Sequence, residues 1–196
     1  MAGTDTLAPG LLVAAPPLAD PNFDQSVVLL AAHSTDGAFG WVINGKEVMS
    51  FEELLRHTDA DETDDPTTSR NVTEGSVRLG GPVGQEQVWL LFPTDLSEVK
   101  YPGQVDLDCG ISATSSREIL TALRVGTAPH TIFGVMGYAG WAPEQLESEI
   151  RVGAWLPTRA ESSLVFGVER GQIWKGAYAR VGANPIAFTS RHVGLA

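Results

Sequence analysis

The sequence predicts a globular domain of mixed α and β structure, and three observations support that prediction. The chain has 196 residues, of which 43% are apolar and 19% charged, a composition typical of compact domains. A chain of this length buries roughly 70% of its unfolded surface, so it can build a core without disulfides or metals. Short apolar runs alternate with helix-start signals, which predicts strands and helices within one domain spanning residues 1–196.

Short apolar runs predict the strands. They are rich in Val, Leu and aromatic residues and are separated by Pro, Asp and Gly. Between the second and third runs, residues 34–37 read Ser-Thr-Asp-Gly, in which Asp-Gly can supply a positive φ angle. The sequence therefore predicts an antiparallel hairpin around this turn. The predicted strands cover residues 11–15, 27–32, 39–43, 87–92, 131–136 and 163–166.

Capping signals and helical spacing predict four helices. Ser50 and Glu53 form a capping box, in which each side chain satisfies a backbone amide of the first turn. Ser115 and Glu118 repeat this pattern before a second apolar face. A proline at the first helical position and a glycine after the last one delimit a further helix. The third predicted helix runs from Pro143 to Gly153, and the fourth covers residues 173–181 and ends at Gly182.

Acidic residues dominate the charge of the chain. The net charge is −11, and residues 47–65 hold eight acids and one arginine. DNA and anionic membranes attract clustered Lys and Arg, so direct nucleic-acid binding is disfavoured and no membrane contact is expected. Residues 58–75 contain acids, threonines and a proline but almost no apolar residue, which predicts a mobile acidic loop.

The single cysteine and the N-terminus indicate the compartment. Cys109 alone forms no intrachain disulfide, and a lone free cysteine is usually a small buried hydrophobe. The apolar run at residues 11–15 has no basic residue before it, although a signal peptide needs a basic start. No run of about 18 apolar residues is present to span a bilayer. The sequence therefore predicts a cytoplasmic protein.

Motifs for cofactors, metals and catalysis are missing or incomplete. Gly40 and Lys46 have the spacing of a phosphate-binding loop, but Glu47 stands where that loop needs Ser or Thr. No two glycines lie two positions apart and the four histidines share no metal-ligand spacing, so we expect no cofactor and no metal. Ser26 and His33 are separated by most of a strand, roughly 23 Å at about 3.3 Å per residue. A nucleophile and its base cannot interact over that distance, so we expect His33 to be structural.

Several ordered segments carry a family resemblance. Residues 10–28 read Gly-Leu-Leu-Val-Ala-Ala-Pro-Pro-Leu-Ala-Asp-Pro-Asn-Phe-Asp-Gln-Ser-Val-Val, and residues 37–44 read Gly-Ala-Phe-Gly-Trp-Val-Ile-Asn. Gly-Gly-Pro-Val at residues 80–83 and Gly-Tyr-Ala-Gly-Trp at residues 137–141 follow in order. With His33 and residues 145–150, these segments resemble the signature of the bacterial AlgH/YqgE family over nearly the whole chain.

The resemblance implies an α+β fold with a branched, mostly antiparallel sheet that is partly curled into a small barrel and surrounded by helices. It implies no established activity, although the family carries the label of transcriptional regulator. We expect a non-enzymatic regulator that acts through a protein or small-molecule partner. The alternative is an enzyme of unrecognised type, with a cleft near Trp141 and with Ser26, His33, Asn44 or Glu149 as its reacting groups.

The polar residues of the signature predict where a ligand binds. Burying polar groups without hydrogen-bond partners is costly, so these side chains are expected to face water or a ligand. We therefore expect at least some of them to meet around a shared surface depression near Trp141. The candidate ligand-binding residues are Asp20, Ser26, Asn44, Trp141, Gln145 and Glu149.

Overall fold

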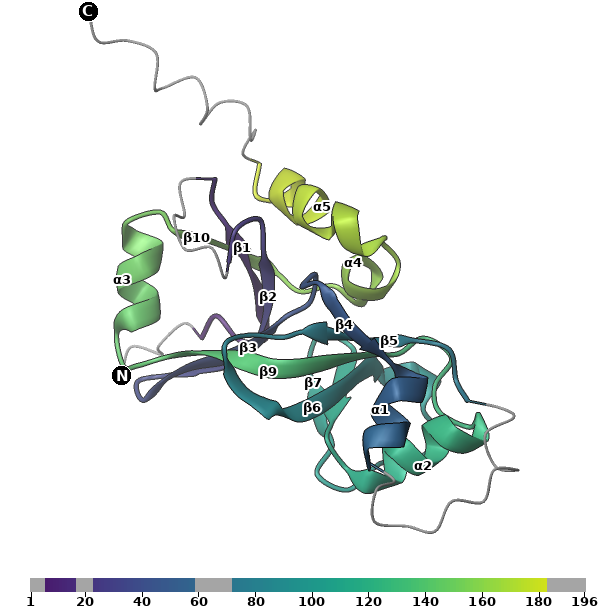
Figure 1. Cartoon of the computed structure of the whole chain (residues 1–196). Coiled ribbons are helices and arrows are strands. Elements are labelled where there is room, and N and C mark those ends of the chain that lie inside the picture. The colour runs from purple at the N-terminus through teal and green to yellow at the C-terminus, as the bar shows by residue number, and fades with distance from the viewer. Residues whose placement is uncertain (1–5, 17–22, 59–71, 183–196) are drawn as a thin grey trace, which may run out of the picture.

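A computed structural model of the chain describes residues 6–16, 23–58 and 72–182 (Figure 1). Ten strands and five α-helices make up these parts of the chain. The strands are β1 (Gly10–Ala14), β2 (Val27–Ser34), β3 (Gly37–Val42), β4 (Glu47–Ser50), β5 (Ser76–Leu79), β6 (Val83–Pro93), β7 (Val105–Leu107), β8 (Ile111–Thr114), β9 (Phe133–Trp141) and β10 (Trp155–Arg159). The helices are α1 (Phe51–Thr58), α2 (Arg117–Val125), α3 (Gln145–Arg151), α4 (Ser162–Phe166) and α5 (Ile173–Arg180), with 3-10 turns η2 (Thr94–Leu96) and η3 (Arg170–Gln172).

The sheet branches at β9. Its main path has the order β10-β1-β2-β3-β9-β6-β8-β7, and β4 pairs with β5, which joins β9. The first part of β9 pairs in parallel with β5 through residues 134–136, and its last part pairs antiparallel with β3 through residues 139–141. The other pairings among the described strands are antiparallel. One long strand therefore changes partner along its length, which produces the branch.

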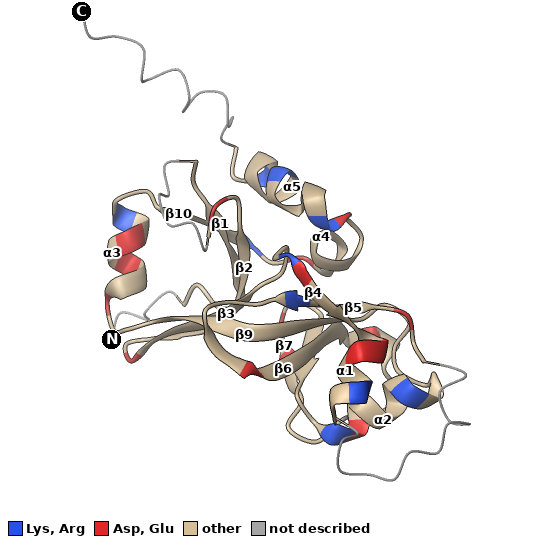
Figure 2. Cartoon of the chain, viewed as in Figure 1, with Lys and Arg blue, Asp and Glu red and all other residues tan. Residues whose placement is uncertain are grey.

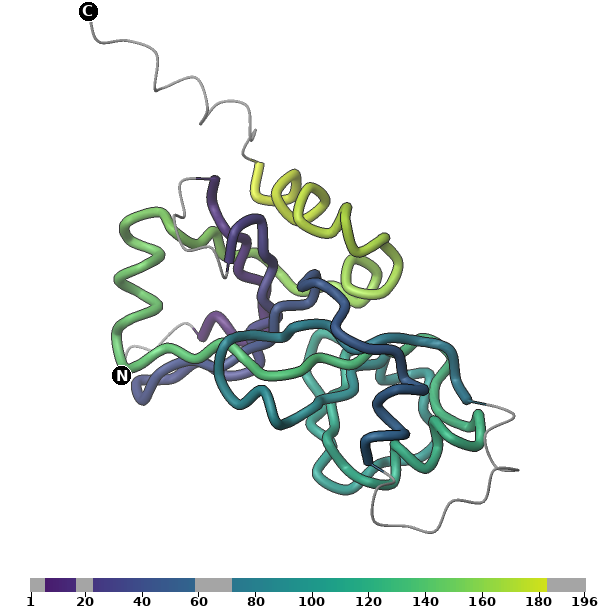
Figure 3. Tube along the Cα trace, in the orientation of Figure 1, coloured from purple at the N-terminus to yellow at the C-terminus, as the bar shows by residue number. Residues whose placement is uncertain are grey.

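The sheet curls into a half-barrel with helices around it, which confirms the α+β fold class. Helices α1 and α2 pack together at one end, and α3 lies against β3 and β10 at the other (Figure 1). The chain path brings α5 back beside the N-terminal strands β1 and β2, and α4 packs against α5 and β6 (Figure 3). Among the described residues, no helix is both long and apolar enough to cross a membrane.

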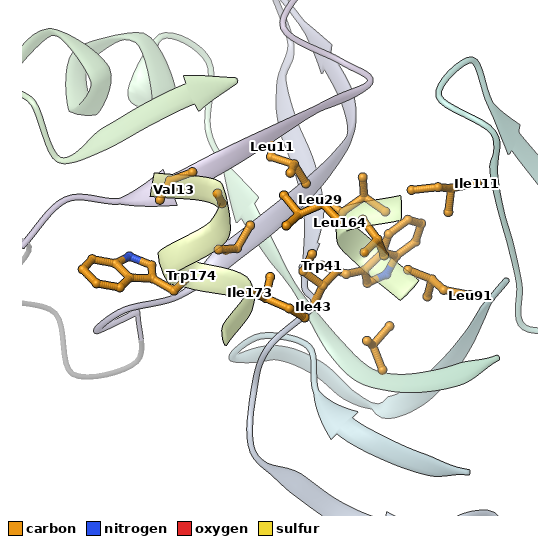
Figure 4. Close-up of a cluster of buried hydrophobic side chains, with 14 of the residues drawn as sticks. Leu11, Val13, Leu29, Trp41, Ile43, Leu91, Ile111, Leu164, Ile173 and Trp174 are labelled. Atoms are coloured by element: carbon orange, nitrogen blue, oxygen red, sulfur yellow. The ribbon is translucent and has the colours of Figure 1, made fainter. Parts of the chain in front are cut away.

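The largest buried cluster holds the C-terminal helices against the sheet. Its side chains come from β1, β2, β3, β6, β8, β9 and both C-terminal helices. Figure 4 shows Leu164 and Ile173 of the helices among side chains of the strands, including Trp41 and Leu91. The indole Nε1 of Trp174 donates to the Ala14 carbonyl oxygen at 2.9 Å. This cluster fixes the position of the segment between α4 and α5 relative to β3.

The N-terminal hairpin and the first capping box are confirmed. Strands β2 and β3 pair antiparallel down to Ser34 opposite Gly37, which has a φ of 124°. The Ser50 amide donates to Glu53 Oε2 at 2.8 Å, and the Glu53 amide donates to Ser50 Oγ at 3.1 Å. The side chains and the backbone thus stabilise the start of α1 reciprocally, as expected from the sequence.

Two elements of the C-terminal third differ from the prediction. The strand predicted at residues 163–166 is wrong, because these residues form α4 and bury Leu164 and Val165 side by side. A short apolar run has no period that separates a strand from one helical turn. The actual strand is β10, which the sequence obscures with Pro157. Since β10 pairs only with β1 among the described strands, it is an edge strand, where a proline is tolerated.

Two helix starts shift by one or two residues. Helix α2 has Ser116 as its N-cap, accepting from the Ile119 amide at 3.4 Å, whereas the sequence predicted Ser115. Helix α3 begins at Gln145 and not at Pro143, because Glu144 adopts a left-handed φ of 62° before it. Of the predicted acidic loop, residues 59–71 lie outside the described residues, so the loop and the single-domain organisation stay predictions.

Candidate functional site

The structure separates the predicted ligand-binding residues into two groups. Asp20 lies outside the described residues. Trp141 pairs with Ala38 at the start of β3, whereas Asn44 follows the end of the same strand. From Ala38 to Val42 the strand spans about 13 Å, and a bend at residues 43–44 follows it. Asn44 is thus separated from Trp141, whereas Gln145 and Glu149 lie beside it, and a depression there that binds a ligand stays a prediction.

The first group surrounds the carboxylate of Glu149, and we call it the Glu149 clamp. It consists of Trp141 at the end of β9, Gln145 and Glu149 on α3, and Trp155 at the start of β10. The indoles of Trp141 and Trp155 both donate to Glu149 Oε2, at 2.9 and 2.8 Å. Gln145 Nε2 donates to Glu149 Oε1 at 2.8 Å. One carboxylate on α3 thus connects the ends of two strands.

Packing and hydrogen bonds within the clamp leave few groups for a ligand to contact. The two tryptophans are 7% and 2% exposed and meet edge to face with their centroids 5.9 Å apart. Gln145 Oε1 accepts the Ala142 amide at 3.0 Å, which fixes the turn before α3. Each side-chain polar group of the clamp has a partner inside the protein. The clamp therefore has the properties of an architectural joint.

His33 lies near the clamp and is likewise satisfied within the protein. Its Nδ1 accepts the Leu7 amide at 3.1 Å, and its Nε2 forms a hydrogen bond of 2.9 Å with Glu147 Oε1. Hydrogen bonds from the backbone amide of Glu147 and then from His33 hold the pKa of the Glu147 carboxyl below its ordinary value. His33 is positioned to join the N-terminal segment, β2 and α3, and Ser26 precedes the far end of its strand.

The second group lies in a cleft of about 510 Å³, which we call the Asn44 cleft. It opens between the end of β3, the turns around β5 and the segment between α4 and α5. The residues lining it are Asp24, Gln25, Ser26, Val42, Asn44, Gly45, Lys46, Leu79, Gly81, Pro82, Gln85, Arg170, Gly171 and Trp174.

Asn44 positions one wall of the cleft through the backbone. Its Oδ1 accepts the Val27 amide at 2.8 Å, and its Nδ2 donates to the Gln25 carbonyl oxygen at 2.8 Å. Gln25 has a φ of 50°, a left-handed conformation that is uncommon for residues other than glycine. Asn44 thus holds a strained turn in place immediately before Ser26. Backbone strain of this kind is found preferentially at functional sites.

Ser26 is a lining residue of the cleft with an unsatisfied hydroxyl. The residue is 5% exposed, and its Oγ is buried with no hydrogen-bond partner among the described residues. A buried hydroxyl without a partner costs about 1–3 kcal/mol relative to one that is hydrogen-bonded. The surrounding structure, including the strained Gln25 beside it, maintains this arrangement.

Close backbone approaches form the floor of the cleft. A Cβ atom at Gly45 would collide with the Leu79 carbonyl oxygen, and one at Gly81 would collide with the backbone of Tyr138. Gly81 also has a φ of 154°, where other residues are strained. Both glycines are therefore required by the chain path that creates the cleft.

Basic side chains gather around the cleft in an otherwise acidic protein. Lys46 and Arg170 line it, and Arg170 Nη1 donates to the Gly45 carbonyl oxygen at 3.3 Å. Arg78 lies close by, with Nη1 donating to the Ile43 carbonyl oxygen at 2.7 Å. Burial, and then the charge of Arg170, hold the pKa of Arg78 below its ordinary value. Figure 2 shows basic segments just before β4, at β5 and between α4 and α5, and an acidic segment at the start of β4.

Metal and thiol chemistry find no support in the described parts of the chain. No group of three or more His, Cys, Asp or Glu side chains there could hold a metal ion. Burial raises the pKa of the Cys109 thiol, which disfavours the reactive thiolate.

Sequence reasoning found Ser26 and Asn44 but missed the charged residues of the cleft. Lys46 appeared only as the end of an incomplete phosphate-binding motif. Arg170 is 125 positions from Gly45, the residue it contacts, so no local pattern connects them. The strand-like run of residues stops before Gly45 and Lys46. This break is the one local sequence signal that marks this edge of the cleft.

Comparison with known proteins identifies the family. A protein-family model described as AlgH-like matches residues 11–186. A UPF0301 protein of Anaeromyxobacter dehalogenans strain 2CP-C is 40% identical over 185 residues, covering 93% of this chain and 91% of that protein. A UPF0301 protein of Alcanivorax borkumensis is 36% identical over 174 residues, covering 89% and 88%. These names state no activity.

Solved structures agree with that family. The solution structure of the AlgH protein from Pseudomonas aeruginosa superimposes with a TM-score of 0.74 at 30% identity, covering 100% of this chain and 99% of that one. A crystal structure of a Corynebacterium diphtheriae protein has a TM-score of 0.65 at 23% identity, covering 88% and 85%, which shows a common fold. The AlgH/YqgE resemblance is thus confirmed at the level of family and fold, and this chain belongs to the AlgH-like family.

Proposed function

We propose that the protein is a non-enzymatic cytoplasmic regulator whose contact with a partner is controlled by a small molecule bound in the Asn44 cleft. The buried, unpaired Ser26 Oγ carries this proposal. A ligand that hydrogen-bonds to this hydroxyl would remove the cost of leaving it unsatisfied. The volume of about 510 Å³ falls within the range of small-molecule sites.

The contacts of the cleft favour binding over catalysis. A serine nucleophile needs a base within hydrogen-bond distance, and Ser26 Oγ has no such partner. The amide of Asn44 is already bonded to two backbone groups. The alternative enzyme with a cleft near Trp141 has less support, because the Glu149 carboxylate accepts three hydrogen bonds within the protein.

The position of the cleft suggests how a ligand regulates. Its lining comes from the sheet and from the segment that leads into α5, which Arg170 joins to Gly45 through one long hydrogen bond of 3.3 Å. A ligand that contacts both sides strengthens this connection. Binding would then stabilise one arrangement of the C-terminal helices against the sheet, and a partner protein that contacts those helices would respond.

Capture of metabolites tests the proposal. The purified protein is mixed with a bacterial metabolite extract and desalted, and the small molecules released on denaturation are identified by mass spectrometry. Wild type and the exposed-site control Ser148→Ala should retain the same compound, chemically unchanged, and Ser26→Ala should retain about fivefold less because it loses one hydrogen bond. Recovery of a converted product would establish an enzyme instead. Retention of nothing above a protein-free control would overturn the proposal.

A further inference from the structure

We infer that the ligand of the Asn44 cleft is a small organic anion whose carboxylate or phosphate group binds between Lys46 and Arg170. This inference rests on the proposed function and adds the chemical class of the ligand. Three observations support it: the charge of the lining, the free donors of the two cations, and the apolar residues of the lining.

The charge of the cleft is opposite to that of the protein. The chain as a whole carries −11, whereas the described lining holds two cations, Lys46 and Arg170, and one carboxylate, Asp24. A local positive region in an acidic protein attracts small anions. The overall negative charge repels long polyanions such as nucleic acids, which would extend beyond the cleft. The charge distribution therefore favours a compact anion.

Both cations have donors left for a ligand. Arg170 uses one N–H group, on the Gly45 carbonyl oxygen, and a guanidinium has five N–H groups in a planar fork. Lys46 forms no ion pair or side-chain hydrogen bond within the described parts of the chain. A carboxylate or phosphate accepts from a fork and an ammonium at once, and such charge-assisted bonds are about twice as strong as neutral ones.

Arg78 adds a further positive charge close to the two cations of the lining. It is partly buried, its guanidinium carbon lies 4.0 Å from the centroid of Phe133, and its Nε is buried without a partner among the described residues. Its charge and that of Arg170 repel each other, and the attraction of Glu47, opposite Arg78 in the β4–β5 pair, is a smaller effect. An anion beside Arg170 offsets this repulsion, so occupancy of the cleft would stabilise the folded protein.

The rest of the lining fits an organic skeleton. Val42, Leu79, Pro82 and Trp174 give the cleft an apolar wall, and Ser26 adds one hydroxyl that either donates or accepts. The Asp24 carboxylate accepts from a hydroxyl or amino group and opposes a second anionic group placed near it. The lining therefore suits a metabolite with one acidic end and a carbon body.

Titration with simple anions tests the inference directly. Amide spectra of the folded protein are recorded with inorganic phosphate in one series and succinate in another, with NaCl at matched ionic strength as the blank. The expected result is saturable shifts at the amides of Ser26, Gly45 and Gly171. Lys46→Met and Arg170→Gln should each raise the dissociation constant about tenfold, since each removes a charge-assisted hydrogen bond. Lys175→Met, on the exposed side of α5, serves as the matched control and should change it less than about twofold.

The outcomes separate this inference from the proposed function. The anion that binds more tightly, inorganic phosphate or succinate, identifies whether a phosphate or a carboxylate is the preferred group. The anion inference is overturned if NaCl at matched ionic strength produces equal shifts. It is also overturned if Lys46→Met and Arg170→Gln leave the shifts unchanged. If the captured metabolite is uncharged and binds these two variants as tightly as wild type, the inference fails and the proposed function stands. If no metabolite is captured and neither anion binds, both fail.

Discussion

The Glu149 clamp and the Asn44 cleft lie at opposite ends of β3 and use their polar side chains differently. In the clamp, one carboxylate accepts two indole N–H groups and one amide, so the buried donors around it are all bonded. In the cleft, Asn44 bonds to the backbone and a strained turn holds Ser26 with its Oγ unpaired. The same kind of polar residue thus has its hydrogen bonds satisfied in one place and keeps a buried hydroxyl without a partner among the described residues in the other.

Replacing Glu149 with leucine should produce the largest loss of stability. The indole N–H groups of Trp141 and Trp155 would remain buried without an acceptor, which costs about 3 kcal/mol in the free energy of unfolding. Urea denaturation measures this loss. Glu149→Gln keeps one acceptor oxygen for the indoles and should cost about 1 kcal/mol. Equal, small losses for the two variants would show that the clamp does not depend on these hydrogen bonds.

Replacing Asn44 with alanine should have a smaller but clear effect. The variant loses two hydrogen bonds of 2.8 Å, to the Val27 amide and the Gln25 carbonyl oxygen, and we expect a loss of about 2 kcal/mol in urea denaturation. Asn44→Asp keeps the acceptor for Val27 and should lose less. Because Asn44 also positions Ser26, anion binding should weaken in Asn44→Ala. Unchanged stability together with lost binding would instead make Asn44 a direct ligand contact.

Asp106 tests how much burial contributes to the stability of the clamp, because its carboxylate also accepts side-chain hydrogen bonds but is exposed to solvent. Hydrogen bonds from Gln104, Ser112 and Lys100, in that order of effect, lower the pKa of Asp106 to about 2. A lowered pKa in the folded state stabilises the protein above the unfolded value of 3.8, and this stability is lost as the pH falls toward 2.

Asp106→Asn should therefore reduce the loss of stability between pH 5 and pH 2. Its side chain is 37% exposed, so solvent screening limits the effect to less than about 1 kcal/mol. Thermal melts across this pH range measure it, with the exposed Asp108→Asn as the control. An effect as large as that of Glu149→Leu would mean that burial of the donors is not what makes the clamp strong.

Local sequence signals predicted the elements that depend on local chemistry. The β2–β3 hairpin follows from Asp36 and Gly37, and the start of α1 follows from Ser50 and Glu53. The strand β10 was not predicted because a proline within a short run argues against a strand. Pro157 is tolerated there because β10 lies at the edge of the sheet beside β1. Family resemblance, and not periodicity, supplied the branched sheet, since the change of partner along β9 leaves no local pattern.

The candidate site was predicted only in part for a related reason. Polarity identified Ser26, Asn44, Gln145 and Glu149 but not which of them have internal partners. That property depends on contacts between distant segments, such as the donation from Trp155 to Glu149 and from Arg170 to Gly45. Which side chains have internal partners is visible only once those contacts are known.

Ser26→Ala should have the smallest effect on stability and tests the central claim most directly. The substitution removes a buried hydroxyl that has no partner, so the free energy of unfolding should stay within about 0.5 kcal/mol of wild type or rise by up to about 1 kcal/mol. Retention of the captured metabolite should fall about fivefold, because the variant loses the hydrogen bond between Ser26 and the ligand. A loss of stability above about 1 kcal/mol with unchanged binding would contradict the account, because Ser26 would then be a structural residue like those of the Glu149 clamp.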